Sequence, residues 1–294
     1  MKESDSILYA KRYPLFLSLQ NTLIMKIIAF ANQKGGVGKT TTAVSLAACL
    51  AEKGIKMLLI DFDPQSNATS AVGIGRQEGH SAYPALLGEG KLKDNIQHTT
   101  IKNLDLIPSE LNLAGAEVDI ARSDNYLHCF QRVLTDLLVE TNYDYIFIDC
   151  PPSLGILTSN ALMAAEGVII TVQCEYLALE GLTMITDLIR KLSTYGNSSL
   201  KLDGIVMTMF DSRTNLSSDV VEEVKKHFGE LVYETYIPRN VRISEAPSYG
   251  QPITIYDPHS AGALAYRALA VEFIKRHKSP PAVKETNPVS PNNS

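Results

Sequence analysis

Short apolar runs alternate with longer segments of mixed apolar and polar residues along most of this 294-residue chain. Runs of roughly four to eight apolar residues are typical of buried strands, and the longer segments have the apolar spacing of helices. We expect strands at Lys26–Ala31, Lys56–Ile60, Leu104–Ile107, Tyr145–Ile148, Gly167–Val172 and Leu202–Met209, and a weaker one at Leu231–Tyr236. We expect helices at Thr40–Lys53, Asn125–Thr141, Gly155–Ala165, Ala178–Thr194, Ser217–Phe228 and Ser260–His277. This alternation predicts an α/β fold with a mostly parallel, doubly wound sheet and helices on both faces.

A glycine-rich turn joins the first expected strand to the first expected helix, which is the context that a phosphate-binding loop requires. Glycine lets the backbone adopt left-handed angles and approach an anion, and the helix N-terminus adds partial positive charge. Lys39 would reach the β- and γ-phosphates, and the Thr40 hydroxyl would ligate Mg²⁺. We therefore expect a nucleoside triphosphate to bind the consecutive loop residues Lys34, Gly35, Gly36, Val37, Gly38, Lys39, Thr40 and Thr41.

Acidic residues follow two of the later strands. Asp149 comes directly after the apolar Ile146–Ile148, an arrangement typical of a carboxylate that holds Mg²⁺ through water. Asp61 and Asp63 are one residue apart and share a face in an extended chain, and Pro64 keeps Asp63 extended. An ordinary solvated acidic turn is the competing interpretation of this second pair.

The loop departs from the general pattern G-x-x-x-x-G-K-[ST], because Gln33 stands at its first glycine and Lys34 opens it instead. It resembles the loop of the deviant Walker A class of P-loop NTPases, which reads K-G-G-x-x-K-[ST]. Three further blocks begin at Asp61, Tyr145 and Ile237. Together they make the chain similar to the ParA/Soj-type chromosome- or plasmid-partitioning ATPases from about residue 25 to about residue 275.

The resemblance implies roles for the residues of these blocks. Asp63 would position the attacking water, and Asp61 would support the Mg²⁺ shell with Thr40 and Asp149. Pro238 and Asn240 would lie near adenine, with Met209 beside them, although the Pro-Arg-Asn sequence also suits an ordinary loop. The cofactors implied are ATP and Mg²⁺.

Lys34 is not expected to bind the same phosphates as Lys39. Lys39 already covers them from within the loop, whereas the side chain of Lys34 lies at the entrance of the loop and faces outward. In the resembling family this lysine contacts the nucleotide of the partner in a face-to-face homodimer. With Asp63 and Lys39 it completes the expected catalytic set. The resemblance implies a switch that dimerises on ATP, binds DNA without sequence preference and hydrolyses ATP slowly. A ParB-like centromere-binding protein would stimulate hydrolysis, and the chain would be cytoplasmic and associated with the nucleoid.

The net charge of −5 and pI near 5.7 argue against a constitutive nucleic-acid binder, which usually carries a basic excess. Any DNA-binding surface must therefore be assembled by folding and dimerisation. Its candidates are the basic residues Arg190, Lys191, Arg213, Arg239, Arg242 and Arg267, each of which suits a solvated surface position equally well.

Two other ATPase classes remain as alternatives. A MinD-type positioning ATPase would act on membrane through a C-terminal amphipathic helix, whereas residues 279–294 are rich in Pro, Asn and Ser. An ATPase like the nitrogenase iron protein would need paired cysteines, whereas those of this chain are widely spaced, at Cys49, Cys129, Cys150 and Cys174. Free thiols in a reducing cytosol are expected, and no structural metal is expected from the scattered histidines.

The chain divides into three expected parts. Residues 1–24 precede the pattern and are expected to be a loosely ordered leader or an overextended start, with a short docking segment as the alternative. Residues 25–278 form the expected ATPase domain, and residues 279–294 the expected disordered tail. No apolar run approaches the roughly 18 residues that a membrane span needs, and no stable membrane association is expected.

Overall fold

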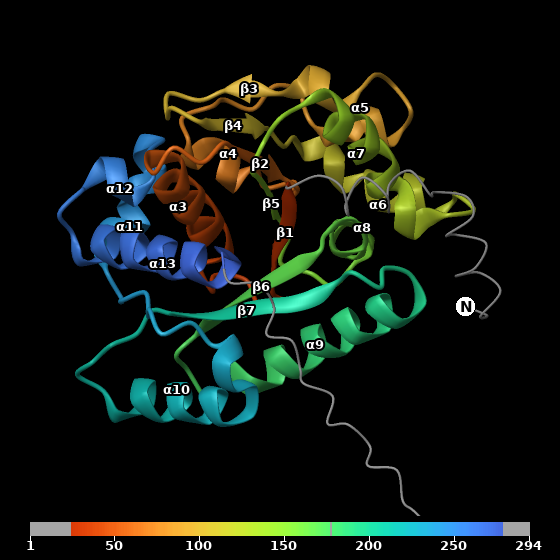
Figure 1. The fold of residues 1–294 in the computed structure, drawn as a ribbon. Coiled ribbons are helices and arrows are strands. Elements are labelled where there is room, and N and C mark those ends of the chain that lie inside the picture. Colours follow the sequence, from red (N-terminus) through yellow and green to blue (C-terminus); the bar gives the residue numbers. More distant parts are fainter. Residues whose placement is uncertain (1–24, 177, 279–294) are drawn as a thin grey trace, which may run out of the picture.

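The computed structural model describes residues 25–176 and 178–278, and its centre is a single sheet of seven strands in the order β3-β4-β2-β5-β1-β6-β7 (Figure 1). The strands are β1 (Lys26–Ala31), β2 (Met57–Asp61), β3 (Gln97–His98), β4 (Leu104–Ile107), β5 (Tyr145–Asp149), β6 (Gly167–Gln173) and β7 (Lys201–Thr208). All neighbouring strands pair in parallel except the short β3, which is antiparallel to β4. The predicted fold class is confirmed.

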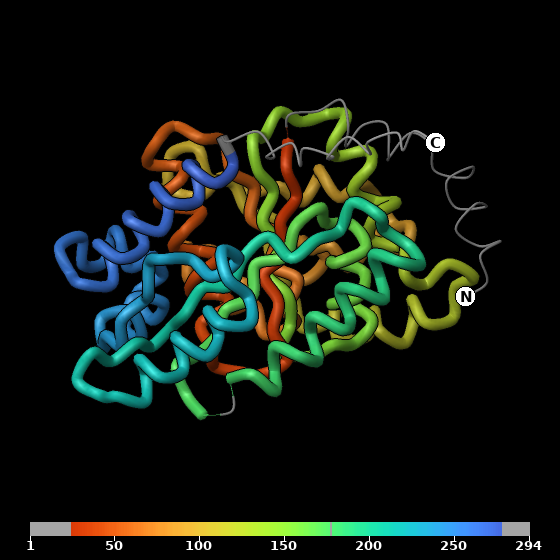
Figure 2. The backbone as a smooth tube through the Cα atoms, turned by 60° about the horizontal axis from the view of Figure 1, so that its bottom comes forward, coloured from red at the N-terminus to blue at the C-terminus, as the bar shows by residue number. Residues whose placement is uncertain are grey.

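Helices cover both faces of the sheet. The helices are α3 (Lys39–Glu52), α4 (Asn67–Ala71), α5 (Ala82–Leu86), α6 (Ala116–Ala121), α7 (Cys129–Glu140), α8 (Ile156–Ala164), α9 (Ala178–Tyr195), α10 (Asn215–Phe228), α11 (Val241–Glu245), α12 (Ile253–Tyr256) and α13 (Ala261–Lys278). Helices α3 and α13 lie side by side on one face (Figures 1 and 2). Helices α7, α8 and α9 lie on the other face.

The strand residues alternate between two apolar cores, one on each face. On β1, Ile27 and Ala29 pack into the core beneath α7–α9, whereas Ile28 and Phe30 pack into the core beneath α3 and α13. A parallel sheet covered on both faces needs apolar residues at every position, which explains why its strands appear as continuous apolar runs in the sequence.

The predicted strand at Leu231–Tyr236 is wrong. Residues Gly229–Leu231 form a 3-10 turn, and the segment touches the sheet through a single bridge between Val232 and Ile205. The Tyr233 N–H donates to the Ile205 carbonyl oxygen of β7 at 2.9 Å, and side chains of α13 bind other backbone groups of the segment. Arg276 donates to the carbonyl oxygens of residues 230 and 232, and Glu272 accepts from the N–H groups of residues 234 and 235.

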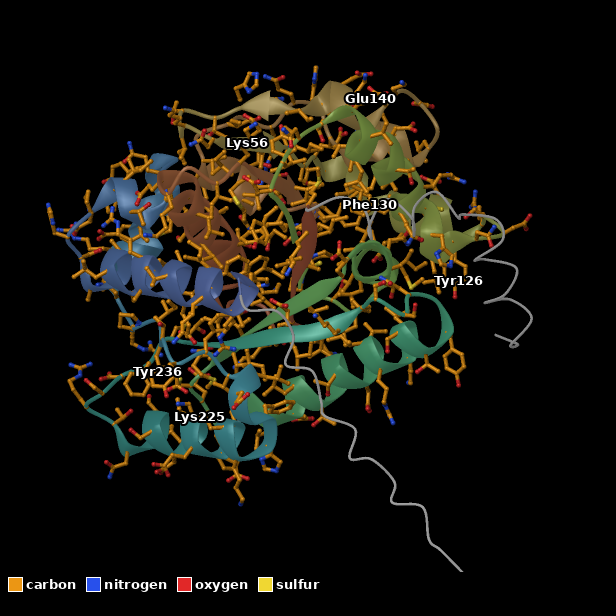
Figure 3. The ribbon with its side chains drawn as sticks, viewed as in Figure 1. Lys56, Tyr126, Phe130, Glu140, Lys225 and Tyr236 are labelled. Carbon is orange, nitrogen blue, oxygen red and sulfur yellow. The ribbon has the colours of Figure 1, made fainter. Side chains whose placement is uncertain are left out.

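The apolar residues of this segment are buried without a strand ladder. Tyr233 is fully buried against β7, close to Gly204, where a Cβ atom would clash with its ring. Tyr236 lies under the ammonium of Lys225 from α10, 5.5 Å from the ring centroid (Figure 3). The apolar pattern of the sequence therefore reflects burial, while the backbone groups are bonded partly by β7 and partly by side chains of α13.

Two further observations bear on the class of protein. Among the described helices, none is both long and apolar enough to span a bilayer. Cys49, Cys129, Cys150 and Cys174 are all buried and free, as expected. The predictions for the leader and the tail fall on residues outside the described ranges.

Candidate nucleotide site

The glycine-rich turn connects β1, an interior strand of the sheet, to the N-terminus of α3. Gly36 and Gly38 have left-handed backbones, with φ of 75° and 82°, whereas Gly35 does not. Gly38 is also the N-cap of α3, so no side chain caps the first N–H groups of this 14-residue helix. Uncapped N–H groups and the helix dipole together favour an anion at this end.

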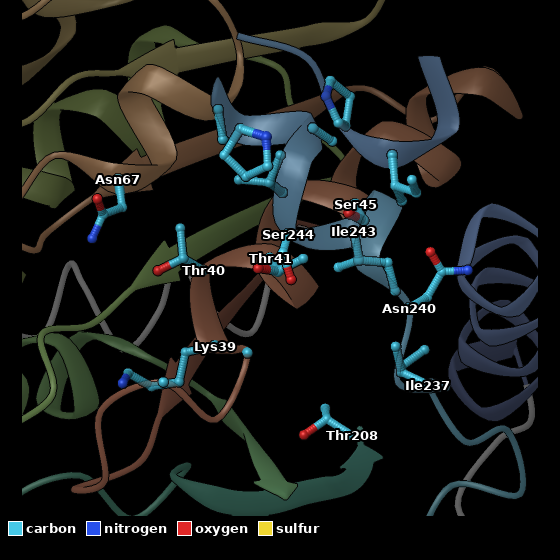
Figure 4. Close-up of a pocket in the computed structure, with 18 of the residues that line it drawn as sticks. Lys39, Thr40, Thr41, Ser45, Asn67, Thr208, Ile237, Asn240, Ile243 and Ser244 are labelled. Carbon is cyan, nitrogen blue, oxygen red and sulfur yellow. The ribbon is translucent and has the colours of Figure 1, made fainter. Parts of the chain in front are cut away.

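The loop forms one end of a cavity of about 800 Å³ (Figure 4). This volume lies in the range of small-molecule sites. The cavity is lined by most of the residues predicted to bind ATP, namely Gly35, Gly36, Gly38, Lys39, Thr40, Thr41, Met209, Pro238 and Asn240, and also by Asp63. The fold thus brings together segments that are more than 100 residues apart in the sequence.

Two predicted loop residues do not line the cavity. Val37 is buried, and its carbonyl oxygen accepts a hydrogen bond from Thr208. Lys34 points away from the cavity, with 48% of its side chain exposed and its Nζ 3.2 Å from Oε2 of Glu175. The predicted outward position of Lys34 is therefore present in this structure.

Lys39 is the buried cation of the site. Its side chain turns back across the loop, with Nζ 3.5 Å from the carbonyl oxygen of Lys34. Burial lowers the pKa of this ammonium, while the nearby carboxylates of Asp149 and Asp63 act in the opposite direction. A buried cation facing an open cavity is suited to an anionic ligand.

Asp149 lies at the end of β5, beneath the loop. It is fully buried, and neither of its carboxylate oxygens has a hydrogen-bond partner of good geometry in the described part of the chain, although the Thr40 hydroxyl approaches closely enough to lower its pKa. Burial, with the charge of Asp61, raises its pKa well above the usual value, whereas Thr40 and Lys39 oppose the shift.

A divalent cation would satisfy these two oxygens. Mg²⁺ is held in proteins by one or two carboxylates together with ligand phosphates and waters. Thr40 and Asp149 supply hard oxygen donors of this kind. No group of three or more His, Cys, Asp or Glu residues suited to a metal occurs within residues 25–278. The donor set therefore fits a Mg²⁺ that shares its shell with a nucleotide, and not a closed metal site.

Both carboxylate oxygens of Asp61 accept hydrogen bonds from the residues that follow it. Its Oδ2 accepts from the backbone N–H and the hydroxyl of Thr69, both at 2.7 Å, and its Oδ1 accepts from the Asp63 N–H at 3.3 Å. Burial raises its pKa to about 6 despite these bonds. This geometry gives Asp61 a supporting role, because it holds α4 and the Asp63 turn in place.

Asp63 is the acidic residue that reaches the cavity. It is largely buried, and its Oδ1 accepts the backbone N–H of Gln65 at 2.9 Å. Burial raises its pKa, while the positive charges of Lys39 and Arg76 lower it. A carboxylate at this position can accept a hydrogen bond from a water molecule in the cavity.

The far wall of the cavity comes from the segment after β7 and the loop before α11. A single bridge joins Phe210 to Pro238, and Met209 between β7 and this bridge has a positive φ of 52°. Asn240 caps α11 by accepting the Arg242 N–H at 2.8 Å. This wall is mostly apolar, which suits the face of a base.

Several cavity residues were not predicted from the sequence, namely Thr208, Ile237, Ile243, Ile253 and Tyr266. Thr208 could have been found, because it lies next to the last residue of the predicted strand Leu202–Met209 and ligands bind beyond the carboxyl ends of parallel strands. The apolar residues and Tyr266 carry no such signal. Tyr266 comes from α13, where its hydroxyl lies 3.2 Å from that of Thr42.

Each arginine predicted for a DNA surface forms an ion pair within the chain. The pairs are Arg190 with Asp187, Arg213 with Asp211, Arg239 with Glu175, Arg242 with Glu245 and Asp257, and Arg267 with Glu52. Arg267 also donates to the carbonyl oxygens of Thr254 and Pro258. This favours a structural role for Arg267 over the predicted DNA contact.

Comparison with known proteins assigns the family. A family model described as an AAA domain matches residues 25–202. The chain is 52% identical to the sporulation initiation inhibitor protein Soj of Bacillus subtilis, covering 84% of this chain and 97% of that protein. It is 44% identical to the chromosome partitioning protein ParA of Caulobacter vibrioides, over 86% of this chain and 96% of that protein. The chain belongs to the Soj/ParA family.

A solved structure connects this Soj/ParA fold with a nucleotide. The structure of cobyrinic acid a,c-diamide synthase from Mycobacterium smegmatis with bound ADP and magnesium matches with a TM-score of 0.75 and 36% identity. The match covers 87% of this chain and 96% of that protein. The resemblance predicted from the motifs is confirmed, and the Soj/ParA chain is a P-loop ATPase by family.

Proposed function

We propose that this chain is a partitioning ATPase that binds ATP and Mg²⁺ in the described cavity, dimerises in that state and binds DNA without sequence preference. The observation that supports the proposal most directly is that the two lysines of the loop have different surroundings. Lys39 is buried and lines the cavity, whereas Lys34 is exposed and points outward. A single nucleotide in this cavity would use Lys39 alone.

Each residue of the site would have a separate role in phosphoryl transfer, which depends on positioning and charge stabilisation. The loop N–H groups and Lys39 would bind the phosphates, and the apolar wall near Pro238 would hold the base. Asp149 and Thr40 would hold Mg²⁺, which neutralises charge that develops on the phosphate oxygens. Asp63 would orient water for attack, and Asp61 would keep the Asp63 turn in place.

Lys34 would contribute to the nucleotide of a second subunit. Its ammonium is at the surface and paired with Glu175, an exposed ion pair of a kind that contributes about 0–1 kcal/mol. Breaking the ion pair with Glu175, so that Lys34 binds a triphosphate in its place, would therefore cost little free energy. ATP would join two subunits through Lys34, and hydrolysis would release them.

DNA binding would require this dimer. The net charge of −5 per chain is unfavourable, and the exposed arginines Arg190, Arg213, Arg239 and Arg242 are each paired with a carboxylate in the single subunit. A dimer would bring arginines of two subunits onto one surface. We propose that a ParB-like centromere-binding protein stimulates a slow intrinsic rate, and that DNA binding associates the protein with the nucleoid.

The test separates ATP binding from dimer formation. Lys34→Ala should bind ATP as the wild type does, form no stable dimer and retain no DNA, because only the contact across the dimer is removed. Lys226→Ala is a matched control, because Lys226 of α10 is an exposed lysine that pairs with a glutamate, as Lys34 does, and is not among the predicted DNA contacts. Calorimetry measures ATP binding, light scattering measures the dimer, and a gel shift at rising salt with ATP, ADP or no nucleotide measures DNA retention.

Two results would overturn the proposal. One is a Lys34→Ala protein that dimerises normally with ATP. The other is DNA retention that is equal in all three nucleotide states, or absent with ATP at low salt. Specific dependence on ATP should be accompanied by a steep fall in affinity with salt, because phosphate contacts release counterions. ATP-dependent binding to liposomes instead of DNA would favour the MinD-type alternative.

A further inference from the structure

Thr208 connects the last strand of the sheet to the phosphate loop. It ends β7, where it pairs with Gln173 of β6, and its side chain is almost completely buried. Its hydroxyl donates to the carbonyl oxygen of Val37 at 2.9 Å. The strand and the loop are 171 residues apart in sequence. Figure 4 shows Thr208 at the side of the cavity that carries the loop before Lys39.

The carbonyl that Thr208 holds belongs to the same peptide group as the N–H of Gly38. No peptide bond among the described residues is cis, and in a planar trans peptide the C=O and the N–H point in opposite directions. Because the Val37 carbonyl is directed at β7, the Gly38 N–H is directed away from β7. The hydroxyl of Thr208 thus sets the orientation of one N–H in the phosphate loop.

The neighbouring peptide group is fixed from the other side. The carbonyl oxygen of Gly38 accepts the Thr42 N–H at 2.9 Å, as the first hydrogen bond of α3. Gly38 is therefore held at φ 82° and ψ 23° between two anchored peptides. A side chain on Gly38 would also lie within 3.7 Å of Cγ2 of Thr208. Only one of the two anchors, the hydroxyl of Thr208, can be removed by a side-chain substitution.

We propose that Thr208 is a positioning residue for nucleotide binding, whose hydroxyl keeps the Gly38 N–H aimed at the phosphates. The inference rests on the proposed function of the cavity. In phosphate loops the backbone N–H groups bind the α- and β-phosphates, which ATP and ADP share. Loss of the hydroxyl should therefore weaken both nucleotides equally and raise KM without changing kcat, as expected for uniform binding.

The experiment compares Thr208→Val with Thr208→Ser and with Thr171→Val. Valine keeps the shape of threonine without the donor, and serine keeps the donor. Thr171 is a matched control, because it is a buried threonine on the neighbouring β6 whose hydroxyl has no partner in the described part of the chain. Calorimetry with ADP and ATP, steady-state kinetics and the melting temperature without nucleotide are measured for each protein.

Thr208→Val should bind both nucleotides about tenfold more weakly, the effect of roughly one lost hydrogen bond. Its KM should rise by the same factor, with kcat within about twofold of the wild type. Thr208→Ser and Thr171→Val should bind within about twofold of the wild type. If Thr208→Val does not fold, Thr208→Ser and Thr208→Ala replace it, since these two variants differ by the hydroxyl alone.

Three outcomes would overturn the inference. Unchanged nucleotide affinity in Thr208→Val, with a wild type that binds, refutes the role of Thr208 and leaves the proposed function intact. Equal weakening in Thr208→Ser shows that the methyl group matters and the hydroxyl does not. A wild type that binds neither nucleotide refutes the proposed function itself, and the inference with it.

Discussion

The strands β2 and β5 each end in a buried aspartate, but the two aspartates differ in their hydrogen bonds. Asp61 and Asp149 are opposite each other in the register of neighbouring parallel strands, and both are fully buried. Asp61 accepts three hydrogen bonds from the turn and helix that follow it. The Asp149 side chain has no such fixed donor among the residues that the structure describes, and only the Thr40 hydroxyl approaches it.

The difference comes from the residues that follow each aspartate. After Asp61 the chain turns back into α4, so that Thr69 presents both its N–H and its hydroxyl to the carboxylate. After Asp149 come Cys150, Pro151 and Pro152, and proline has no N–H to donate. One carboxylate is therefore used to hold the structure together, and the other is left available for a cation. Burial and a raised pKa alone do not distinguish the two.

The largest expected effect belongs to Asp63, two residues beyond Asp61. Asp63→Ala should still bind ATP, but it should hydrolyse ATP about 10²–10⁴-fold more slowly, because the carboxylate that orients the water is lost. Turnover at saturating ATP and Mg²⁺ measures this. The exposed Asp219→Ala on α10 is the control. An unchanged turnover number in Asp63→Ala would assign the role to another residue.

The next effect tests the free carboxylate of Asp149. Asp149→Asn should reduce the affinity for Mg²⁺ in the presence of ATP by about 10–100-fold, because metal affinity commonly falls by this factor when a group that supports the metal site is removed. The stability of the protein without nucleotide should fall less than in Asp61→Asn, because no well-aligned hydrogen bond holds the Asp149 side chain, and only the Thr40 hydroxyl and the Lys39 charge act on it. Mg²⁺ titrations of ATP affinity and thermal melts test the two parts separately. A large loss of stability would show that Asp149 has a structural role like that of Asp61.

Asp61→Asn should behave in the opposite way. The amide oxygen can keep both Thr69 donors, but the NH₂ would then face the Asp63 N–H and leave it without an acceptor, at a cost of about 1–3 kcal/mol in the free energy of unfolding. Denaturant unfolding without nucleotide measures this loss. Thr69→Val, which removes only the hydroxyl donor, should cost less. Equal stability of Asp61→Asn and the wild type would contradict the supporting role.

The smallest effect concerns Glu166, a buried carboxyl that precedes β6 at the opposite edge of the sheet. Its Oε1 also has no partner among the described residues, and burial raises its pKa to about 7, opposed by the nearby Lys26 and Lys201. The folded protein binds the proton more tightly than the unfolded chain does. Stability must therefore fall as the pH rises from about 4.5 to about 7.

Glu166→Gln should remove this part of the pH dependence. We expect the variant to gain melting temperature over the wild type at pH 8 and to match it near pH 5, where Glu166 is protonated in the folded state. The difference between variant and wild type at the two pH values is the measurement, which cancels the titration of Asp61 and Asp149. A difference that is the same at both pH values would exclude Glu166 as its source.

Much of this site could be predicted from the sequence, because the features that indicate it lie close together along the chain. The phosphate loop, α3 and the aspartates at strand ends are set by residues within a few positions of one another, through glycine conformation, helix start and apolar runs. Six of the seven predicted strands and the longer helices were found at nearly their true bounds for the same reason. The strand β3 and the helices α4, α5, α6, α11 and α12 were missed, because two to six residues are too few to show a period.

The tertiary structure alone decided the partners of these residues. The sequence shows two aspartates at strand ends, and only the return of α4 onto β2 makes Asp61 structural and leaves Asp149 unpaired. The segment at Leu231–Tyr236 has a strand pattern, but it meets β7 only at an isolated bridge, and side chains of α13 bind its other backbone groups. The contact of Thr208 with Val37 spans most of the domain. Local conformation depends on neighbours in sequence, whereas a hydrogen-bond partner depends on which segments the fold brings within about 3 Å.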